Sequence, residues 1–265
     1  MMNHSVRELF QLTGRVAVVT GASSGLGQRA ATVLANAGAQ VVGVARRATM
    51  LEEWKDAMNA EHASADNGQQ RAEIVAADLI QREMIPEIAQ QVSAPFGPPD
   101  IIVHAAGINT RQPADDVTPD QWDTTLQLNL SAPFFLTQAL VPHMKQQKWG
   151  RIVNFASLQS TRAFPGGIAY GTTKAGISQM TRAMAADWGV HGITANAIGP
   201  GFFPTELTNA VFSDSERAAR NAAQTCLGRN GELTDLDGPL LFLCSDASAY
   251  VTGQTLMVDG GFTAK

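Results

Sequence analysis

Short apolar runs alternate with longer amphipathic segments along the whole chain. The apolar runs are rich in Val, Ile and Ala, which is typical of strands buried on both faces of a sheet. They predict seven strands, at Val16–Thr20, Val41–Ala45, Ala72–Ala77, Ile101–His104, Arg151–Phe155, Ile193–Ile198 and Thr255–Val258. Helical patterns separate nearly all of them, and strands joined by helices run parallel through right-handed crossovers. The pattern therefore predicts an α/β fold, with one doubly wound, mostly parallel seven-stranded sheet and helices on both faces.

The domain organisation predicted from this pattern is simple. A chain of 265 residues with 45% hydrophobic content can bury a full core, and no repeat or low-complexity linker divides it. We expect an N-terminal extension over residues 1–11 and one domain over residues 12–265. The stretch from Glu206 to Arg229 is polar, helical and bounded by loops. We therefore expect residues 202–230 to form a lid over a substrate.

Charge and hydropathy exclude two classes of partner. The formal net charge is -5 and no basic run offsets it, which argues against binding to nucleic acid or to an anionic membrane surface. The longest apolar stretches are far shorter than the roughly 18 residues that a membrane span requires. The N-terminus lacks an apolar signal core, so we expect a cytoplasmic location.

The two cysteines give no sign of a metal or nucleophilic site. Cys226 and Cys244 have no metal-type spacing and no conspicuous base beside them. We interpret both as reduced structural thiols, and we predict no metal site.

The first turn carries the strongest local signal. The sequence TGASSGLG follows the first predicted strand and opens a helix that runs to about Ala37, before Gly38. Glycines allow the tight turn and a close approach to a pyrophosphate, which the helix N-terminus attracts. The spacing is G-x-x-x-G-x-G, different from the common G-x-G-x-x-G. We predict a dinucleotide site here, with contacts from Gly21, Ser23, Ser24, Gly25, Leu26 and Gly27.

A second signal lies between Phe155 and Lys174. Ser157 follows the fifth predicted strand, while Tyr170 and Lys174 are four residues apart and share one face of a helix. A free tyrosine has a pKa of about 10, and lowering it to near neutrality requires about 4 kcal/mol. A lysine ammonium about 5 Å away supplies roughly 3 kcal/mol at an effective dielectric constant of about 20. Taken alone, Tyr-x-x-x-Lys is also common on ordinary amphipathic helices.

Together these residues identify a family resemblance. The TGASSGLG turn, Asn129, Ser157, Tyr170, Lys174 and the Pro200-Gly201 pair resemble the short-chain dehydrogenase/reductase family, from about Leu12 to Gly261. The resemblance implies a Rossmann-type sheet, hydride transfer between NAD(P) and a carbonyl or secondary alcohol on a small molecule, and a homotetramer.

The resemblance also implies roles for four side chains. In the reduction direction Ser157 would bind the substrate carbonyl and Tyr170 would donate the proton. Lys174 would lower the tyrosine pKa and hold the nicotinamide ribose, and Asn129 would connect the group to solvent through a water molecule. Pro133 lies four residues after Asn129 and lacks an N–H. We therefore expect a kinked helix and a free Asn129 carbonyl that holds the relay water.

The remaining cofactor contacts follow from the same resemblance. Asp78 would accept a bond from the adenine amine, although it could equally cap a helix. The family's Asn-Asn-Ala-Gly is replaced here by His104-Ala105-Ala106-Gly107, and His104 is open to a second interpretation, a core histidine with satisfied hydrogen bonds. The full set of implied contacts outside the first turn is Arg46, Asp78, Leu79, His104, Ala105, Gly107, Tyr170, Lys174, Pro200, Gly201, Phe203 and Thr205.

The end of the second strand bears on the choice of cofactor. Members that prefer NAD carry an acid where this chain has Ala45, and Arg46 could bind a 2′-phosphate with its planar guanidinium. We therefore predict NADP(H), with NAD(H) possible, because Ser24 stands where many NADP-dependent relatives have a second basic residue.

The substrate is predicted only by class. The stretches AGINTRQP, SLQST and GFFPTELTNAVFSD resemble those of sugar-acid dehydrogenases of the gluconate 5-dehydrogenase type. With such a substrate Arg111 could bind a carboxylate, or it could be an exposed loop cation. The first alternative is a reductase of 3-oxoacyl thioesters on an acyl carrier protein. The second is a non-catalytic NADP(H)-binding sensor or scaffold, against which the complete set of four catalytic-type residues argues.

Overall fold

The computed structural model describes residues 5–63 and 70–265, and it contains one sheet of seven parallel strands. The strand order is β3-β2-β1-β4-β5-β6-β7. The strands are β1 (Val16–Thr20), β2 (Gln40–Ala45), β3 (Ala72–Ala76), β4 (Ile101–His104), β5 (Gly150–Phe155), β6 (Ile193–Pro200) and β7 (Thr255–Val258). The predicted fold class is confirmed, and each predicted strand lies within two residues of the observed one.

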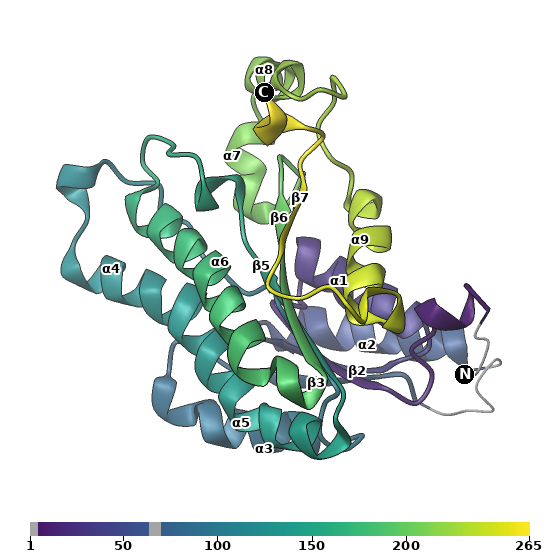
Figure 1. Ribbon diagram of the computed structural model, residues 1–265. Helices are drawn as coiled ribbons and strands as arrows, with labels where there is room; N and C mark the ends of the chain where they lie inside the picture. Colours follow the sequence, from purple (N-terminus) through teal and green to yellow (C-terminus); the bar gives the residue numbers. More distant parts are fainter. Residues whose placement is uncertain (1–4, 64–69) are drawn as a thin grey trace.

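Helices cover both faces of this sheet (Figure 1). They are α1 (Gly25–Asn36), α2 (Ala48–His62), α3 (Ile85–Ser93), α4 (Pro119–Leu126), α5 (Ala132–Gln147), α6 (Ile168–Trp188), α7 (Asn209–Phe212), α8 (Ser215–Gln224) and α9 (Asp237–Cys244). Successive strand residues point to opposite faces. Accordingly Val19 belongs to the core beneath α1, α2 and α9, whereas Val18 belongs to the core beneath α3, α5 and α6.

Helix α4 begins with a capping box. Thr118 caps it, accepting a hydrogen bond from the Gln121 backbone N–H, while the Gln121 side chain binds the Thr118 backbone N–H. Pro119 occupies the first helical turn, where an N–H is not needed.

The predicted irregularity near Pro133 has a different form from a simple kink. Gln127–Ser131 form a π-helical turn, and the Ala132 N–H bonds to the Gln127 carbonyl five residues back. Proline cannot donate to the carbonyl four residues before it, so the wider turn forms just ahead of it. Asn129 lies in the middle of this turn and is 1% exposed.

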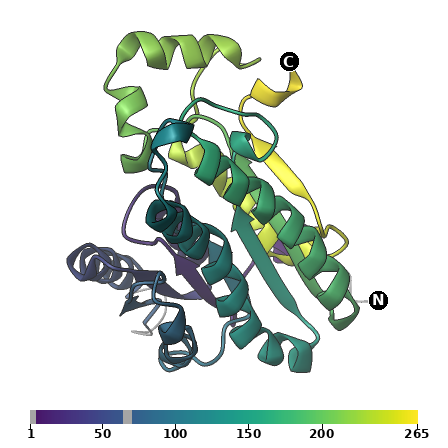
Figure 2. The same cartoon turned by 90° about the vertical axis from the view of Figure 1, so that its left-hand side faces the viewer.

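The carboxyl ends of the parallel strands share one edge of the sheet, where the loops after β1, β4, β5 and β6 meet. Figures 1 and 2 show α7 and α8 together at one end of the molecule, on the connection that follows β6. The strand order changes direction between β1 and β4. In open α/β sheets, ligands bind outside the carboxyl ends at such a point.

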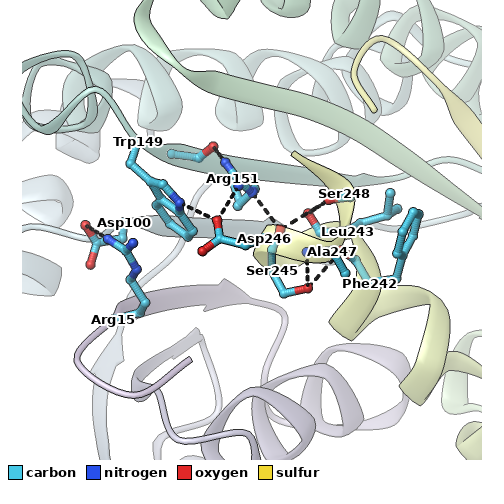
Figure 3. Close-up of polar contacts among 11 residues, drawn as sticks. Arg15, Asp100, Trp149, Arg151, Phe242, Leu243, Ser245, Asp246, Ala247 and Ser248 are labelled. Carbon is cyan, nitrogen blue, oxygen red and sulfur yellow. Dashed lines mark hydrogen bonds and ion pairs between the residues drawn. The ribbon is translucent and has the colours of Figure 1, made fainter. Parts of the chain in front are cut away.

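A polar cluster joins the elements at the opposite edge of the sheet (Figure 3). Arg151, the second residue of β5, is 2% exposed and donates hydrogen bonds to the Ser245 carbonyl and to Asp246, 3.0 Å and 2.9 Å long. The Trp149 indole donates to the same Asp246 carboxylate, and its ring lies between the guanidinium groups of Arg15 and Arg151. This cluster fixes the segment after α9 to the start of β5.

Within the described ranges, no helix has both the length and the apolar character that crossing a membrane requires.

Candidate active site

The glycine-rich turn after β1 lies close to two other segments of the chain, which leave little room for side chains at its glycines. Gly21 has φ 73°, and a Cβ there would lie 2.8 Å from the Ala106 nitrogen. Gly25 has φ 57°, and a Cβ there would lie 3.2 Å from the Thr205 side chain. The turn therefore leaves a concave backbone surface at the N-terminus of α1, which suits a pyrophosphate. The residues present fit a dinucleotide.

A cleft of about 430 Å³ opens over this turn. Most of the predicted cofactor contacts line it, namely Gly21, Ser23, Ser24, Gly25, Leu26, Gly27, Arg46, Asp78, Leu79, Ala105, Gly107 and Thr205. The Asp78 carboxylate accepts a bond from the Ile80 backbone N–H at 3.1 Å, so it turns the loop after β3 while facing the cleft. The walls run from the end of β2 to the end of β4, the position at which such folds bind a dinucleotide.

His104 requires a correction, because its ring lies away from this cleft. The side chain is buried against α5, with Nε2 2.7 Å from the Thr137 hydroxyl oxygen. That hydroxyl donates its hydrogen to the Pro133 carbonyl, so the histidine must carry a hydrogen on Nε2. Burial lowers the pKa of His104 to about 3. His104 is a neutral core residue that bridges β4 and α5.

The buried histidine makes stability depend on pH. Its pKa in the folded state is lower than its ordinary value, so the unfolded state binds the extra proton and stability is lost as pH falls below about 6.5. Relative to His104→Asn, the wild type should lose roughly 2 kcal/mol between pH 7 and pH 5. Urea unfolding of both proteins at the two pH values measures this, and a stability difference that stays constant with pH would contradict it.

A second cavity, of about 170 Å³, adjoins the cleft. Leu26, Thr205 and Leu207 line both spaces, so the two are neighbours. The predicted site residues that line the second cavity are Leu26, Ser157, Tyr170, Pro200, Gly201, Phe203 and Thr205. Pro200, Gly201 and Phe203 therefore face the substrate side, next to the cleft that was predicted for them.

The fold brings Ser157 and Tyr170 together in the wall of this cavity, and the buried Lys174 lies behind Tyr170 without lining either space. Burial raises the pKa of Tyr170, while a hydrogen bond with Ser157 and the positive charge of Arg111 act to lower it. The Lys174 ammonium lies 5.6 Å from the centre of the tyrosine ring and donates to the Phe155 carbonyl at 2.6 Å. Burial lowers the pKa of Lys174 to about 8, so the amine is still mostly protonated at neutral pH.

Asn129 holds the wall behind this group. Its side chain accepts from the Ile108 N–H and donates to the Ile108 carbonyl, both at 2.9 Å, and it also donates to Thr173 at 3.2 Å. A Cβ on Gly107 would lie 3.2 Å from the Asn129 oxygen and 3.8 Å from the Lys174 nitrogen. The amide is thus fully used in fixing the loop after β4, and the water relay through its backbone carbonyl stays a prediction.

Sequence reasoning missed Arg47, the neighbour of Arg46. Both arginines line the cleft, but it is Arg47 that hydrogen-bonds to the hydroxyl groups of Ser23 and Ser24. Two consecutive arginines after a strand were visible in the sequence. Which of them turns toward the glycine-rich loop depends on how α2 begins, at Ala48.

Two arginines, Arg111 and Arg217, line the second cavity. Arg111 is half-buried with φ 51°, and its guanidinium donates to the Leu207 carbonyl at 2.9 Å, so it is not a freely exposed loop cation. Arg217, from α8, was not predicted and lies in the same cavity wall. A helix of the expected lid segment carries it, and only the packing of that segment brings it near Tyr170.

The two cysteines lie in different environments. Cys244 is buried, which raises its pKa to about 12 and keeps it protonated, and Cys226 is exposed. Across the part of the chain that the structure describes, His, Cys, Asp and Glu side chains form no group of three or more that could hold a metal ion.

Comparison with known proteins finds similarity over nearly the whole chain. A family model described as enoyl-(acyl carrier protein) reductase matches residues 21–263. The chain is 38% identical over 256 residues to gluconate 5-dehydrogenase of Gluconobacter oxydans (strain 621H), covering 97% of each chain. It is 38% identical over 261 residues to 2-dehydro-3-deoxy-D-gluconate 5-dehydrogenase of Escherichia coli (strain K12), covering 97% of this chain and 98% of that one.

A solved structure has the same fold over nearly the whole chain. The crystal structure of a gluconate 5-dehydrogenase from Burkholderia cenocepacia, in complex with NADP and tartrate, aligns with a TM-score of 0.89 and 36% sequence identity. The alignment covers 98% of this chain and all of that one.

Proposed function

This chain belongs to the short-chain dehydrogenase/reductase family of oxidoreductases, and we propose that it interconverts a ketone and a secondary alcohol on a sugar acid, with NADP(H) as its cofactor. One observation carries the proposal. Tyr170, Ser157 and Arg111 line a single small cavity that adjoins a dinucleotide cleft. A proton donor, a hydroxyl that can bind a carbonyl, and a cation for a carboxylate therefore surround the same space.

The chemistry divides between the cofactor and the chain. NADP(H), when bound, supplies or accepts the hydride. A substrate oxygen in the cavity can accept hydrogen bonds from both Ser157 and Tyr170. Tyr170 then donates a proton to that oxygen during reduction and removes one during oxidation.

Lys174 supports the tyrosine by its charge and position. Its ammonium is anchored on the Phe155 carbonyl and faces Gly107, at the wall of the cleft. A positive charge this close to the tyrosine ring favours the phenolate, which opposes the effect of burial. The remaining ammonium hydrogens can donate to a ribose in the cleft, as the family resemblance implies.

The assignment of NADP(H) rests on the end of β2 and on the relatives. Ala45 stands where members that prefer NAD carry an acid, and both Arg46 and Arg47 line the cleft where a ribose 2′-phosphate would lie. The similar Burkholderia enzyme was crystallised in complex with NADP.

The assignment of an acidic substrate rests on two arginines. Arg111 and Arg217 reach the substrate cavity from separate segments, one from the loop after β4 and one from α8. A carboxylate bound there would gain charge-assisted hydrogen bonds. The Gluconobacter and Escherichia relatives are named for sugar-acid substrates.

A substrate panel tests the proposal. The enzyme is assayed with gluconate and other sugar acids, with uncharged polyols of the same length, and with acetoacetyl thioesters in the reductive direction. We expect the highest kcat/KM with a sugar acid. Preference for the thioester would instead support the acyl-carrier reductase, and cofactor binding without turnover of any compound would support a sensor.

A variant of Arg111 tests whether this side chain binds the carboxylate of the substrate. Arg111→Gln should raise the KM for the sugar acid about tenfold or more, because a hydrogen bond to a charged group is lost, and leave the KM for a polyol nearly unchanged. Arg220→Gln is the control, because it makes the same chemical change at an arginine that pairs with Glu216 on α8 and does not line the cavity. Equal losses for acid and polyol would contradict a role in binding the carboxylate.

A further inference from the structure

The side chain of Glu206, on the segment after β6, is hydrogen-bonded to other residues in the wall of the dinucleotide cleft. The Arg47 guanidinium donates to Glu206 at 3.0 Å and forms an ion pair with its second oxygen at 2.9 Å. The Ser24 hydroxyl donates to the same carboxylate at 3.0 Å. Hydrogen bonds to Arg47 and Ser24 hold the pKa of Glu206 below its usual range, so the group is charged at neutral pH.

The donors that hold Glu206 are of the kind that bind phosphate. Ser24 is the N-cap residue of α1, yet its hydroxyl makes no capping bond and is directed to the carboxylate. The free N–H groups of a helix N-terminus favour an anion at this place. Arg47 adds a planar guanidinium, whose remaining donors rest on the hydroxyls of Ser23 and Ser24. A guanidinium and a serine hydroxyl at the N-cap of α1 thus converge on one anion.

The position of this donor set matches one part of the proposed cofactor. Arg47 lies just past the end of β2, where a dinucleotide places its adenosine ribose and where an arginine receives the 2′-phosphate. Ser24, Arg47 and Glu206 all line the dinucleotide cleft. The Glu206 carboxylate therefore uses the donors that a 2′-phosphate would need.

We propose that Glu206 is an internal competitor of the cofactor 2′-phosphate, bound to Arg47 and Ser24 in the free enzyme and displaced when NADP(H) binds. This inference rests on the proposed NADP(H) dependence. NAD(H) has only a hydroxyl at that carbon and has no charge with which to compete for the arginine. Glu206 therefore reduces the preference for NADP(H) over NAD(H).

The displacement is physically reasonable because the ion pair is partly solvated. The side chains of Arg47 and Glu206 are 45% and 58% exposed, and exposed ion pairs are weak. A phosphate carries more charge and more acceptor oxygens than a carboxylate, so it makes more hydrogen bonds to the same donors. We expect the competition to reduce NADPH affinity by about fivefold, which corresponds to about 1 kcal/mol.

The test compares the dissociation constants of NADPH and NADH, measured by fluorescence titration. Glu206→Gln should bind NADPH about threefold to fivefold more tightly than the wild type, with NADH affinity changed less than twofold. Glu216→Gln is the matched control, since it removes the same charge from an exposed site on α8 that pairs with Arg220. It should bind both cofactors as the wild type does.

A second variant separates competition from a general effect of charge. In an Arg47→Gln background, Glu206→Gln should leave NADPH affinity unchanged, because the shared partner is gone. If the wild type prefers NADPH and Glu206→Gln binds it no more tightly, or if the gain persists without Arg47, the inference is overturned alone. If the wild type binds NADPH no more tightly than NADH, the cofactor assignment is overturned with it.

Discussion

Tyr170→Phe should lower kcat by about 10²–10⁴-fold, the range that a general acid contributes. The substitution removes the tyrosine hydroxyl that, in the proposed function, exchanges a proton with the reacting oxygen, while the ring keeps its packing. Because Tyr170 lines the substrate cavity and not the phosphate-binding part of the cleft, the dissociation constant of NADPH should change little. Steady-state kinetics with the best compound of the panel and a cofactor titration measure the two effects.

The chain provides its own control for this variant. It has two tyrosines, and Tyr250 is fully exposed on the connection between α9 and β7. Tyr250→Phe makes the same chemical change and should retain wild-type kcat. Activity of Tyr170→Phe within tenfold of the wild type would show that another group transfers the proton.

The largest expected effect on stability is that of Arg151→Met. Methionine removes the guanidinium that lies over the Trp149 ring and leaves the Asp246 carboxylate without that partner (Figure 3). The Ser245 carbonyl loses its 3.0 Å bond from Arg151 and keeps the 3.4 Å bond from the Ser248 hydroxyl. We expect the free energy of unfolding to fall by about 2–4 kcal/mol, a loss moderated because Asp246 is itself half-exposed. The melting temperature should fall by roughly 5–12 °C.

Arg151→Met should lower stability without changing the catalytic rate, because the cluster lies far from the proposed active site. Arg151 lies at the start of β5, whereas Ser157 follows its other end, so kcat below the melting transition should be unchanged. Arg182→Met is the control, because Arg182 is exposed on α6 and donates to neighbouring Gln179. It should change stability by less than about 0.5 kcal/mol. Equal melting temperatures for the two variants would contradict a stabilising role of the cluster.

Much of the fold was predictable because its signals are local. Val16–Thr20 is a strand by its apolar run, and Gly21 and Gly25 adopt positive φ angles that the glycine pattern anticipates. The capping box at Thr118 depends only on residues three apart. Such features are decided within a few residues of chain.

The sites that were mispredicted or missed depend on contacts between distant segments. For His104 the sequence left two interpretations open, a cofactor contact or a core histidine, and the hydrogen bond to Thr137 on α5 decides for the core histidine. Arg47 was passed over for Arg46, and the difference depends on Ser23, Ser24 and Glu206. Side-chain direction in such cases follows from packing, which periodicity does not describe.

The sequence alone therefore determined the alternation of strands and helices, the phosphate-binding turn, and the spacing that places Tyr170 one helical turn from Lys174. These follow from backbone sterics and from periodicities that are the same in any protein. The tertiary structure alone decided that Arg111 and Arg217 border the tyrosine's cavity and that Glu206 reaches Arg47, 159 residues away. Each of those contacts joins segments whose separation in space is set only once the sheet and its helices have packed.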